Sequence, residues 1–393
     1  MAAAGSAPDA PFTLARSAGA EAHAKETVAA LVSAAEDAAG GAFAGAALGG
    51  ALGAGEGAVV RSSGGGLLAE GPFELLVVVD APLRAATAIR RRVRRAVGEA
   101  ARARHVLAVA DVVARSALPF LPPTLRTLDL LGTGRVVAGP PELLGGAPDP
   151  VRIAPEAREG LRLLVRRGAD LLRAEAMADR APRGRAAREA LRIVEETDLS
   201  LGAVILLGSG RWVPGLGGRD AALRELASPD AGRPAVGFLT RMTWTRFRDL
   251  VDRHRAALAA RVEGPDTASF PDTRRAVARA ADRWLEVLRL SEEERLAEAL
   301  PDWTEYAAVL AGRSAAAADG ILFEDAFGDA ASRRTTRRAA RAWDAAERVA
   351  PALAALVDWD PGDLPIVPVL LDLPENASRE AMRQRAIAWG ASV

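Results

Sequence analysis

The stretch Leu48–Asp80 decides the fold. It opens with Leu48-Gly-Gly-Ala-Leu-Gly-Ala-Gly-Glu-Gly57 and closes with Phe73-Glu-Leu-Leu-Val-Val-Val-Asp80. Clustered glycines let backbone N–H groups approach an anion closely, so the first part is typical of a phosphate-cradling loop. The second part is a continuous aliphatic run, typical of a buried strand. The stretch therefore predicts a strand-loop-strand unit whose second strand, Phe73–Val79, has a carboxylate near each end, Glu74 and Asp80.

The chain on either side of this stretch predicts alternating helices and strands. An amphipathic helix is expected over 21–39 and an arginine-rich helix over 82–104, where Pro82 suits a first helical turn. Further strands are expected over residues 42–48, 59–60, 105–110 and 135–138. From Pro155 onward the apolar spacing is helical throughout.

These patterns predict an α+β fold, in which a small mixed β-sheet domain is followed by a larger all-helical domain. We expect a flexible N-terminus over 1–20, the sheet domain over 21–150, and the helical domain over 151–393. A break near 313–330 divides the helical part into two subregions. Residues 229–393 carry no motif that suggests a role.

Composition limits the classes of partner. The chain has 393 residues, half of them apolar, with 51 basic and 51 acidic side chains and no cysteine. The charge balance disfavours a nucleic-acid partner, and the absence of cysteine removes thiolate metal sites and thiol nucleophiles. The uncharged run 38–55 is mostly glycine and alanine, so we expect no membrane span. With no signal-peptide pattern at the N-terminus, we expect a cytoplasmic protein.

The glycine loop resembles a known motif. Residues 50–57 are similar to the Gly-Ser-x-x-Arg-Gly-Glu-Gly loop of a bacterial branch of the DNA polymerase β superfamily of nucleotidyltransferases. The resemblance continues in the strand after Phe73, in Leu121-Pro-Pro-Thr-Leu with Asp129, and in Leu206–Trp212 with Arg219. It covers roughly residues 20–228 and implies a nucleotidyltransferase-like sheet domain with a following helical domain. It also implies transfer of a nucleoside monophosphate from a nucleoside triphosphate with Mg²⁺ held by clustered aspartates.

The expected catalytic residues are largely replaced. The loop serine and arginine positions hold Ala51 and Ala54, and the Asp-x-Asp pair falls on Pro72-Phe73-Glu74. Proline offers no ligand, and one carboxylate is too few to hold two magnesium ions beside a triphosphate. We therefore expect an inactive metal site in which Glu74 is the one candidate catalytic residue, with Mg²⁺ and a nucleoside triphosphate bound only if the protein is an active transferase.

Two ways of restoring the metal site stay open. Glu70 could replace the carboxylate lost at position 72, with Glu74 as the other candidate ligand. Asp80 lies on the same strand face as Glu74, but six residues along a strand is about 20 Å, too far to share an ion. Asp111 is expected at the far end of its own strand.

The loop and the arginine-rich helix each allow a second interpretation. Six loop residues are candidates for contact with a nucleotide or other phosphorylated ligand: Gly50, Ala51, Gly53, Gly55, Glu56 and Gly57. The same glycines could form only a tight turn, and Glu56 could cap the loop backbone rather than orient a reacting group. The arginines between Arg90 and Arg95 could face solvent, or contact phosphate or nucleic acid.

Three hypotheses for function follow. The first is a degenerate nucleotidyltransferase-like protein, a pseudoenzyme that acts as a nucleotide- or phosphate-binding or regulatory module. The second is an active nucleotidyltransferase that uses Mg²⁺ to move a nucleoside monophosphate to a hydroxyl acceptor. The third is a helical interaction or scaffold protein. Fold alone cannot choose among them.

Overall fold

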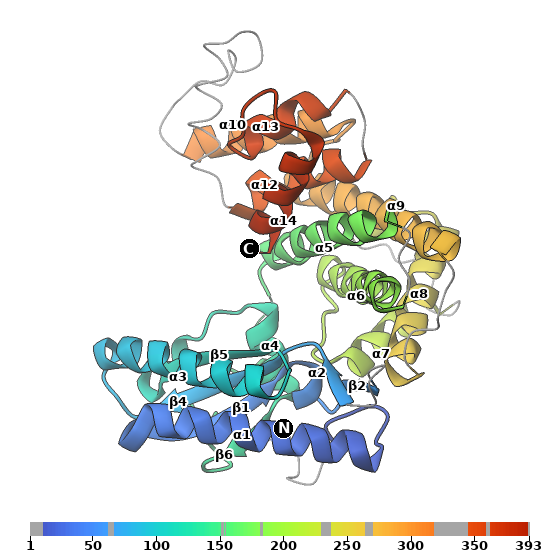
Figure 1. Ribbon diagram of the computed structural model, residues 1–393. Coiled ribbons are helices and arrows are strands. Elements are labelled where there is room, and N and C mark those ends of the chain that lie inside the picture. Colours follow the sequence, from blue (N-terminus) through green and yellow to red (C-terminus); the bar gives the residue numbers. More distant parts are fainter. Residues whose placement is uncertain are drawn as a thin grey trace. The chain divides into compact units, whose positions relative to one another are not determined.

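The computed structural model (Figure 1) divides into two compact units. The first unit contains Met1–Glu156, Trp212–Ala222 and Leu258–Gly264, and the second contains Ala157–Arg211, Leu223–Ala257 and Pro265–Val393. The structure describes residues 11–61, 67–150, 153, 155–180, 184–228, 237–263, 270–317, 345–358 and 362–391.

The first unit is an α+β structure. Its helices are α1 (Ala18–Ala39), η1 (Gly40–Ala42), α2 (Gly50–Gly53), α3 (Leu83–Ala103), η2 (Arg115–Phe120) and α4 (Leu125–Thr133). Its strands are β1 (Phe43–Gly49), β2 (Ala58–Arg61), β3 (Leu67–Glu70), β4 (Phe73–Val79), β5 (Ala108–Ala114) and β6 (Arg135–Ala138).

Four of these strands form a mixed sheet in the order β5-β4-β1-β6. Strand β1 pairs antiparallel with both β4 and β6, whereas β4 and β5 run parallel. The parallel pair is joined by α3, because parallel neighbours need a long crossover. Strands β2 and β3 form a separate two-stranded sheet.

Helices α1 and α3 pack against one face of the four-stranded sheet (Figure 1). The alternation along β4 explains this, since Phe73, Leu75 and Val77 point to the helices while Leu76 and Val78 point to the other face. Leu130 of α4 belongs to the second cluster, on the Leu76 face. Glu74 therefore lies on the α4 side of the sheet.

Arginines of α3 cover the free edge of the sheet. Strand β5 is an edge strand, and its Ala110 and Val112 carbonyls accept hydrogen bonds from Arg94 and Arg90 at 3.0 Å. These contacts occupy acceptors that could otherwise pair with another strand. Part of the arginine cluster thus has a structural role that neither sequence interpretation included.

The described part of the N-terminus is packed rather than flexible. The Glu21 carboxylate accepts hydrogen bonds from the backbone N–H groups of Phe12 and Thr13 at 2.7 and 2.8 Å, and Thr13 is fully buried. Thr13 also forms a bridge with Gly57. The sequence prediction placed residues 11–17 in a flexible segment because it could not anticipate this partner.

The regular elements that the described residues of the second unit form are all helices. Its elements are α5 (Ala157–Ala178), α6 (Arg185–Gly208), η4 (Gly237–Thr240), α9 (Phe270–Leu296), α10 (Trp303–Ala317), α12 (Ala345–Asp358), η5 (Leu364–Ile366), α13 (Val367–Leu370) and α14 (Arg379–Gly390). Helices α7 (Leu216–Leu226) and α8 (Trp244–Glu263) cross from one unit into the other.

Helices α5, α6 and α9 form the centre of the second unit. Trp284 of α9 is fully buried and donates its indole N–H to the Leu164 carbonyl of α5 at 2.9 Å. Close approach of the ring requires Gly168, where a Cβ would lie 2.5 Å from the Trp284 ring. Arg283 of α9 binds both oxygens of Asp198 on α6 in a buried pair.

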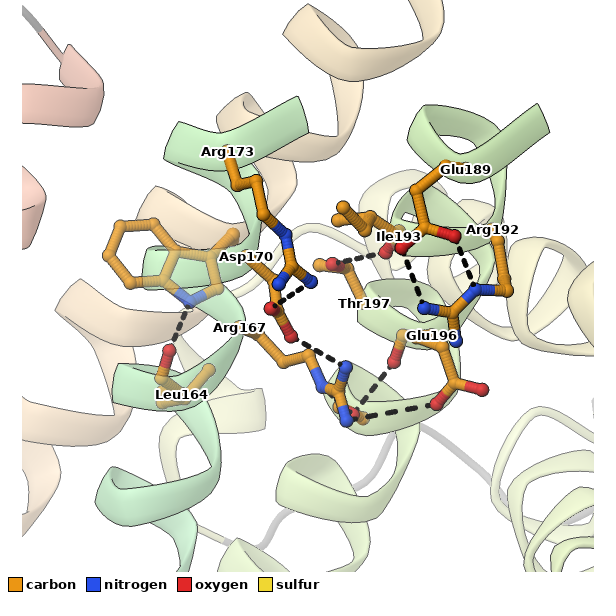
Figure 2. Close-up of polar contacts among 11 residues, drawn as sticks. Leu164, Arg167, Asp170, Arg173, Glu189, Arg192, Ile193, Glu196 and Thr197 are labelled. Carbon is orange, nitrogen blue, oxygen red and sulfur yellow. Dashed lines mark hydrogen bonds and ion pairs between the residues drawn. The ribbon is translucent and has the colours of Figure 1, made fainter. Parts of the chain in front are cut away.

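A polar network joins α5 to α6 (Figure 2). Arg167 donates to Asp170 at 2.9 Å and to the Ser200 hydroxyl at 3.0 Å, and its guanidinium lies 3.7 Å from Glu196. These groups are only partly exposed, so the network fixes how the two helices pair.

The coarse prediction of a small mixed sheet followed by helices is confirmed. Strands β4 and β6 have the predicted bounds, but β5 begins at Ala108 and continues to Ala114 instead of covering 105–110. His105 has a positive φ of 55°, which ends the helix in a turn and delays the strand. Helix α4 and strand β3 were not predicted. Residues 318–344, which include most of the proposed break at 313–330, lie outside the described residues.

Candidate functional site

Glu74 and Asp111 lie near each other on the α4 side of the sheet. In the parallel pairing of β4 and β5, Glu74 is opposite Val109 and Leu76 is opposite Asp111. Side chains of one face recur every second residue, so Glu74 and Asp111 are diagonal neighbours on adjacent strands. The prediction that Asp111 lies at the far end of its strand is wrong, because β5 is displaced toward the C-terminus.

Arg126 of α4 bridges the two carboxylates. Its Nε donates to Glu74 Oε2 at 2.6 Å, and its Nη1 donates to Asp111 Oδ2 at 2.7 Å. Arg94 of α3 donates to the other oxygen of Asp111 at 2.7 Å. One guanidinium therefore lies where two neighbouring carboxylates would otherwise repel each other or share a metal ion.

The site is open to solvent on one side. The side chains of Arg126, Glu74 and Asp111 are 41%, 24% and 40% exposed. At this exposure each ion pair adds little to stability, about 0.2–1 kcal/mol. The importance of the arrangement is that it neutralises both acids and fixes their orientation.

The other expected metal ligands do not join this pair. Pro72 precedes β4 and has no ligand atom, and Glu70 belongs to the separate β2–β3 sheet. Asp80 lies beyond the opposite end of β4, where it accepts a hydrogen bond from Arg115 Nε at 2.7 Å. That hydrogen bond lowers the pKa of Asp80 and raises the pKa of Arg115. Within the described ranges, no three acidic or histidine side chains converge as a metal site would require.

The glycine loop begins beside Glu74. Gly50 has a φ of 63°, and a Cβ there would lie 3.0 Å from Glu74 Oε1. Helix α2 is only a single turn that follows β1. The predicted loop and the Glu74–Arg126–Asp111 cluster are therefore neighbouring parts of one region.

The second half of the loop is occupied by internal hydrogen bonds. The amides of Ala54, Gly55 and Glu56 donate to the carbonyls of Gly50, Leu52 and Ala51, and the Gly57 amide donates to the Phe12 carbonyl. Gly55 has a φ of 76°, and a Cβ there would lie 2.7 Å from the Pro11 carbonyl oxygen. The glycines after Gly53 thus form a turn covered by the N-terminal segment, which agrees with the tight-turn interpretation for that half.

Arg135 holds the loop from the sheet edge at β6. It is 5% exposed and donates to the carbonyls of Gly53 at 2.9 Å and Pro11 at 2.6 Å. Its guanidinium also lies 4.4 Å from the centre of the Phe12 ring, a cation–π contact. Burial lowers the pKa of Arg135, and the nearby charge of Glu21 opposes that shift. Only the first turn, Gly50–Gly53, is left as the part of the loop near the carboxylate cluster.

Glu56 caps the N-terminus of helix α7 and does not join the Glu74–Arg126–Asp111 cluster. Its two carboxylate oxygens accept hydrogen bonds from the backbone N–H groups of Leu216 at 2.6 Å and Gly217 at 2.7 Å, at the start of α7. Asp129 of α4 accepts from the Gly215 amide at 3.1 Å and from Arg219. Glu56 thus caps backbone, but the backbone is that of α7 and not that of its own loop as the sequence alternative had it.

Arg126 is the residue of the site that the sequence interpretation missed. It lies just after the Leu121-Pro-Pro-Thr-Leu segment, and Thr124 caps α4 by accepting from the Thr127 amide. That capping threonine is a signal that could have predicted α4 and placed Arg126 in its first turn. Nothing in the sequence indicated which carboxylates the arginine would contact.

None of the helices formed by the described residues is long and apolar enough to cross a membrane. Comparison with models of protein families, with curated proteins and with solved structures finds no match to this chain.

Proposed function

We propose that this chain is a degenerate nucleotidyltransferase-like protein, similar to the DNA polymerase β superfamily, that binds a nucleotide or other phosphorylated molecule without catalysis. It would act as a binding or regulatory module. One observation carries the proposal: the Arg126 guanidinium lies between Glu74 and Asp111. A fixed organic cation there takes the place of the mobile divalent ion that nucleotidyl transfer requires.

The geometry supports phosphate binding at the first turn of the loop. Arg126 uses two of its five N–H donors on Glu74 and on the nearer Asp111 oxygen, which leaves donors for a phosphate oxygen. Gly50 lies against the same Glu74 carboxylate. A phosphate bound between Arg126 and the Gly50–Gly53 turn would accept from the remaining N–H donors of the guanidinium instead of binding to a metal.

Calorimetric titration of the full chain with ATP, GTP, CTP and UTP tests the proposal. We expect binding of at least one triphosphate with a dissociation constant that changes less than about threefold when Mg²⁺ is added, since the ion would find no cage of protein oxygens. Pyrophosphate release should stay at the level of a reaction without protein. Arg126→Ala should weaken binding at least about tenfold, the loss of one charge-assisted contact.

Control variants test whether a loss of binding is specific to Arg126 and to the first turn of the loop. Arg115→Ala removes an arginine of the same unit that pairs with Asp80 outside the cluster, and it should bind like the parent chain. Ala51→Asp introduces a negative charge into the first turn and should weaken binding, whereas Ala51→Asn should not. Gly55 is unsuitable for this purpose, because any side chain there meets the Pro11 carbonyl.

The other two hypotheses make opposite predictions in the same experiment. Binding that requires Mg²⁺, together with pyrophosphate release, would favour an active transferase in which Arg126 moves away and Glu74 and Asp111 hold the metal. Absence of binding by any triphosphate to the folded chain would leave the helical interaction or scaffold protein.

A further inference from the structure

Helix α3 carries an excess of positive charge that is not compensated within the helix. It contains seven arginines and one acidic residue, Glu99. The longer helix α9 contains six arginines and six acidic residues, and the whole chain is balanced at 51 of each sign. Arginine is frequent throughout this sequence, but in α3 it is not compensated by carboxylates.

Four of these arginines form a straight outer row. They lie at helical positions that fall within about 20° of one line and span about 27 Å along the axis. The row consists of Arg84, Arg91, Arg95 and Arg102. All four are exposed, and no carboxylate of the described residues forms an ion pair with any of them.

The neighbouring arginines of α3 bind other elements of the first unit, and for two of them no carboxylate within the described ranges compensates the positive charge. Arg90 donates to the Val112 carbonyl and Arg92 to the Ala38 carbonyl, so both are bound to neutral groups. Arg94 alone is paired with an acid, Asp111. On the adjacent helix α1, Glu36 and Asp37 precede the contacted Ala38, so acidic residues lie on the α1 side of α3.

We propose that this outer row of α3 is an interaction surface for the phosphate backbone of a nucleic-acid duplex. Guanidinium groups bind phosphate oxygens with paired N–H donors, and a duplex presents phosphates at high density along a line. The residues between the arginines are small, Thr87, Ala88 and Gly98, so the surface has no aromatic platform for single-stranded bases.

The same observations disfavour a lipid surface as the occupant. A helix that binds at a membrane interface inserts an apolar face, but apart from Leu83 at its start, which is exposed, the large apolar side chains of α3 are buried against the sheet. The proposal is independent of phosphate binding beside Glu74, because the outer row faces away from the sheet that carries Glu74. It revises the expectation, drawn from net charge alone, that nucleic acid is disfavoured.

Fluorescence anisotropy of the full chain with a labelled duplex of about 20 base pairs, as DNA and as RNA, tests the proposal. Four phosphate contacts predict a log–log salt slope of about −3.6, so affinity should fall roughly 150-fold between about 50 and 200 mM salt. Changing the four row arginines to glutamine should weaken binding at about 50 mM salt at least about 100-fold and remove most of the salt slope.

The control removes the same charge elsewhere. It changes four exposed arginines of the second unit to glutamine: Arg246, Arg248, Arg274 and Arg279. We expect the control to bind within about threefold of the parent chain, since nonspecific long-range charge is screened. Four outcomes would each overturn the proposal. They are an equal loss of binding in both variants, no binding of either duplex by the parent chain, tighter binding of single strands than of duplexes, and binding only to phosphatidylserine vesicles. Circular dichroism of both variants verifies that they are folded.

Discussion

Glu56 accepts a hydrogen bond at 2.6 Å from the backbone N–H of Leu216, which lies 160 residues further along the chain. The other oxygen of Glu56 accepts from the next amide, that of Gly217. A carboxylate at a helix N-terminus satisfies amides that have no partner within the helix and interacts favourably with the helix dipole. Through this contact the glycine loop holds the segment Trp212–Ala222 in the first unit.

Glu56→Ala should therefore destabilise the first unit. Removing the carboxylate that caps α7 leaves the amides of Leu216 and Gly217 without this partner. We expect this to cost about 1–2 kcal/mol of unfolding free energy. Glu99→Ala, which removes an exposed acid from α3 of the same unit, should change stability by less than about 0.5 kcal/mol. Urea denaturation followed by circular dichroism measures both. Equal stability of the two variants would contradict the capping role.

Gly168→Ala should destabilise the second unit although alanine is the better helix former. The added Cβ would lie 2.5 Å from the Trp284 ring, so the ring or α5 must shift. Overpacking of this kind costs about 1–3 kcal/mol, which exceeds the gain of about 1 kcal/mol from helix propensity. Thermal unfolding should show a lower Tm.

Gly160→Ala in the same helix is the matched control. Its Cβ would meet the nearest side chain, Leu207, at 3.7 Å, an ordinary contact distance. Stability should be unchanged or rise by up to about 1 kcal/mol. If Gly168→Ala were as stable as Gly160→Ala, the close packing of Trp284 on α5 would be refuted.

The pair Asp80–Arg115 should produce a pH dependence at acid pH. The hydrogen bond from Arg115 holds the pKa of Asp80 below its ordinary value. A carboxyl whose folded pKa is lowered stabilises the folded state above its unfolded pKa, and this contribution is lost as the pH falls through the folded pKa. The effect is confined to acid pH because both values lie below about 4.

Carbon-detected NMR titration of the Asp80 carboxyl measures that shift. In Arg115→Ala the pKa of Asp80 should return toward its ordinary value, because the largest cause of the shift is removed. Arg126→Ala, which acts at the other end of β4, should leave the Asp80 titration unchanged. A shift that persists without Arg115 would show that another group is responsible.

The fold could be predicted in outline from local pattern, and the site only in part. Strand β4 follows directly from its aliphatic run, and Glu74 was placed on it correctly. Strand β5 was placed too early because Val106 and Leu107 look like strand residues, whereas the positive φ of His105 delays pairing until Ala108. That displacement of a few residues is what brings Asp111 beside Glu74.

The partners of charged residues could not be predicted, because they depend on tertiary contacts. Glu56 and Asp129 contact a segment that follows in sequence only after α5 and α6. Arg126 carries no periodicity that would distinguish a bridging arginine from a solvent-exposed one. Sequence therefore placed Glu74 on its strand, while the second acid, Asp111, and the cation between the two acids became known only from the structure.

Arg126→Ala should convert the carboxylate pair into a weak cation site. Without the guanidinium, Glu74 and Asp111 remain neighbours on adjacent strands and their repulsion is relieved by a divalent ion. With two carboxylates and water as ligands, we expect a dissociation constant of about 10⁻⁴–10⁻³ M for Mn²⁺, as in weak oxygen sites. Electron paramagnetic resonance of free Mn²⁺ measures this, and the parent chain should bind at least about tenfold more weakly. The double variant Glu74→Gln/Arg126→Ala should lose the gained site. If Arg126→Ala gains no Mn²⁺ binding, the guanidinium is not a substitute for a metal ion.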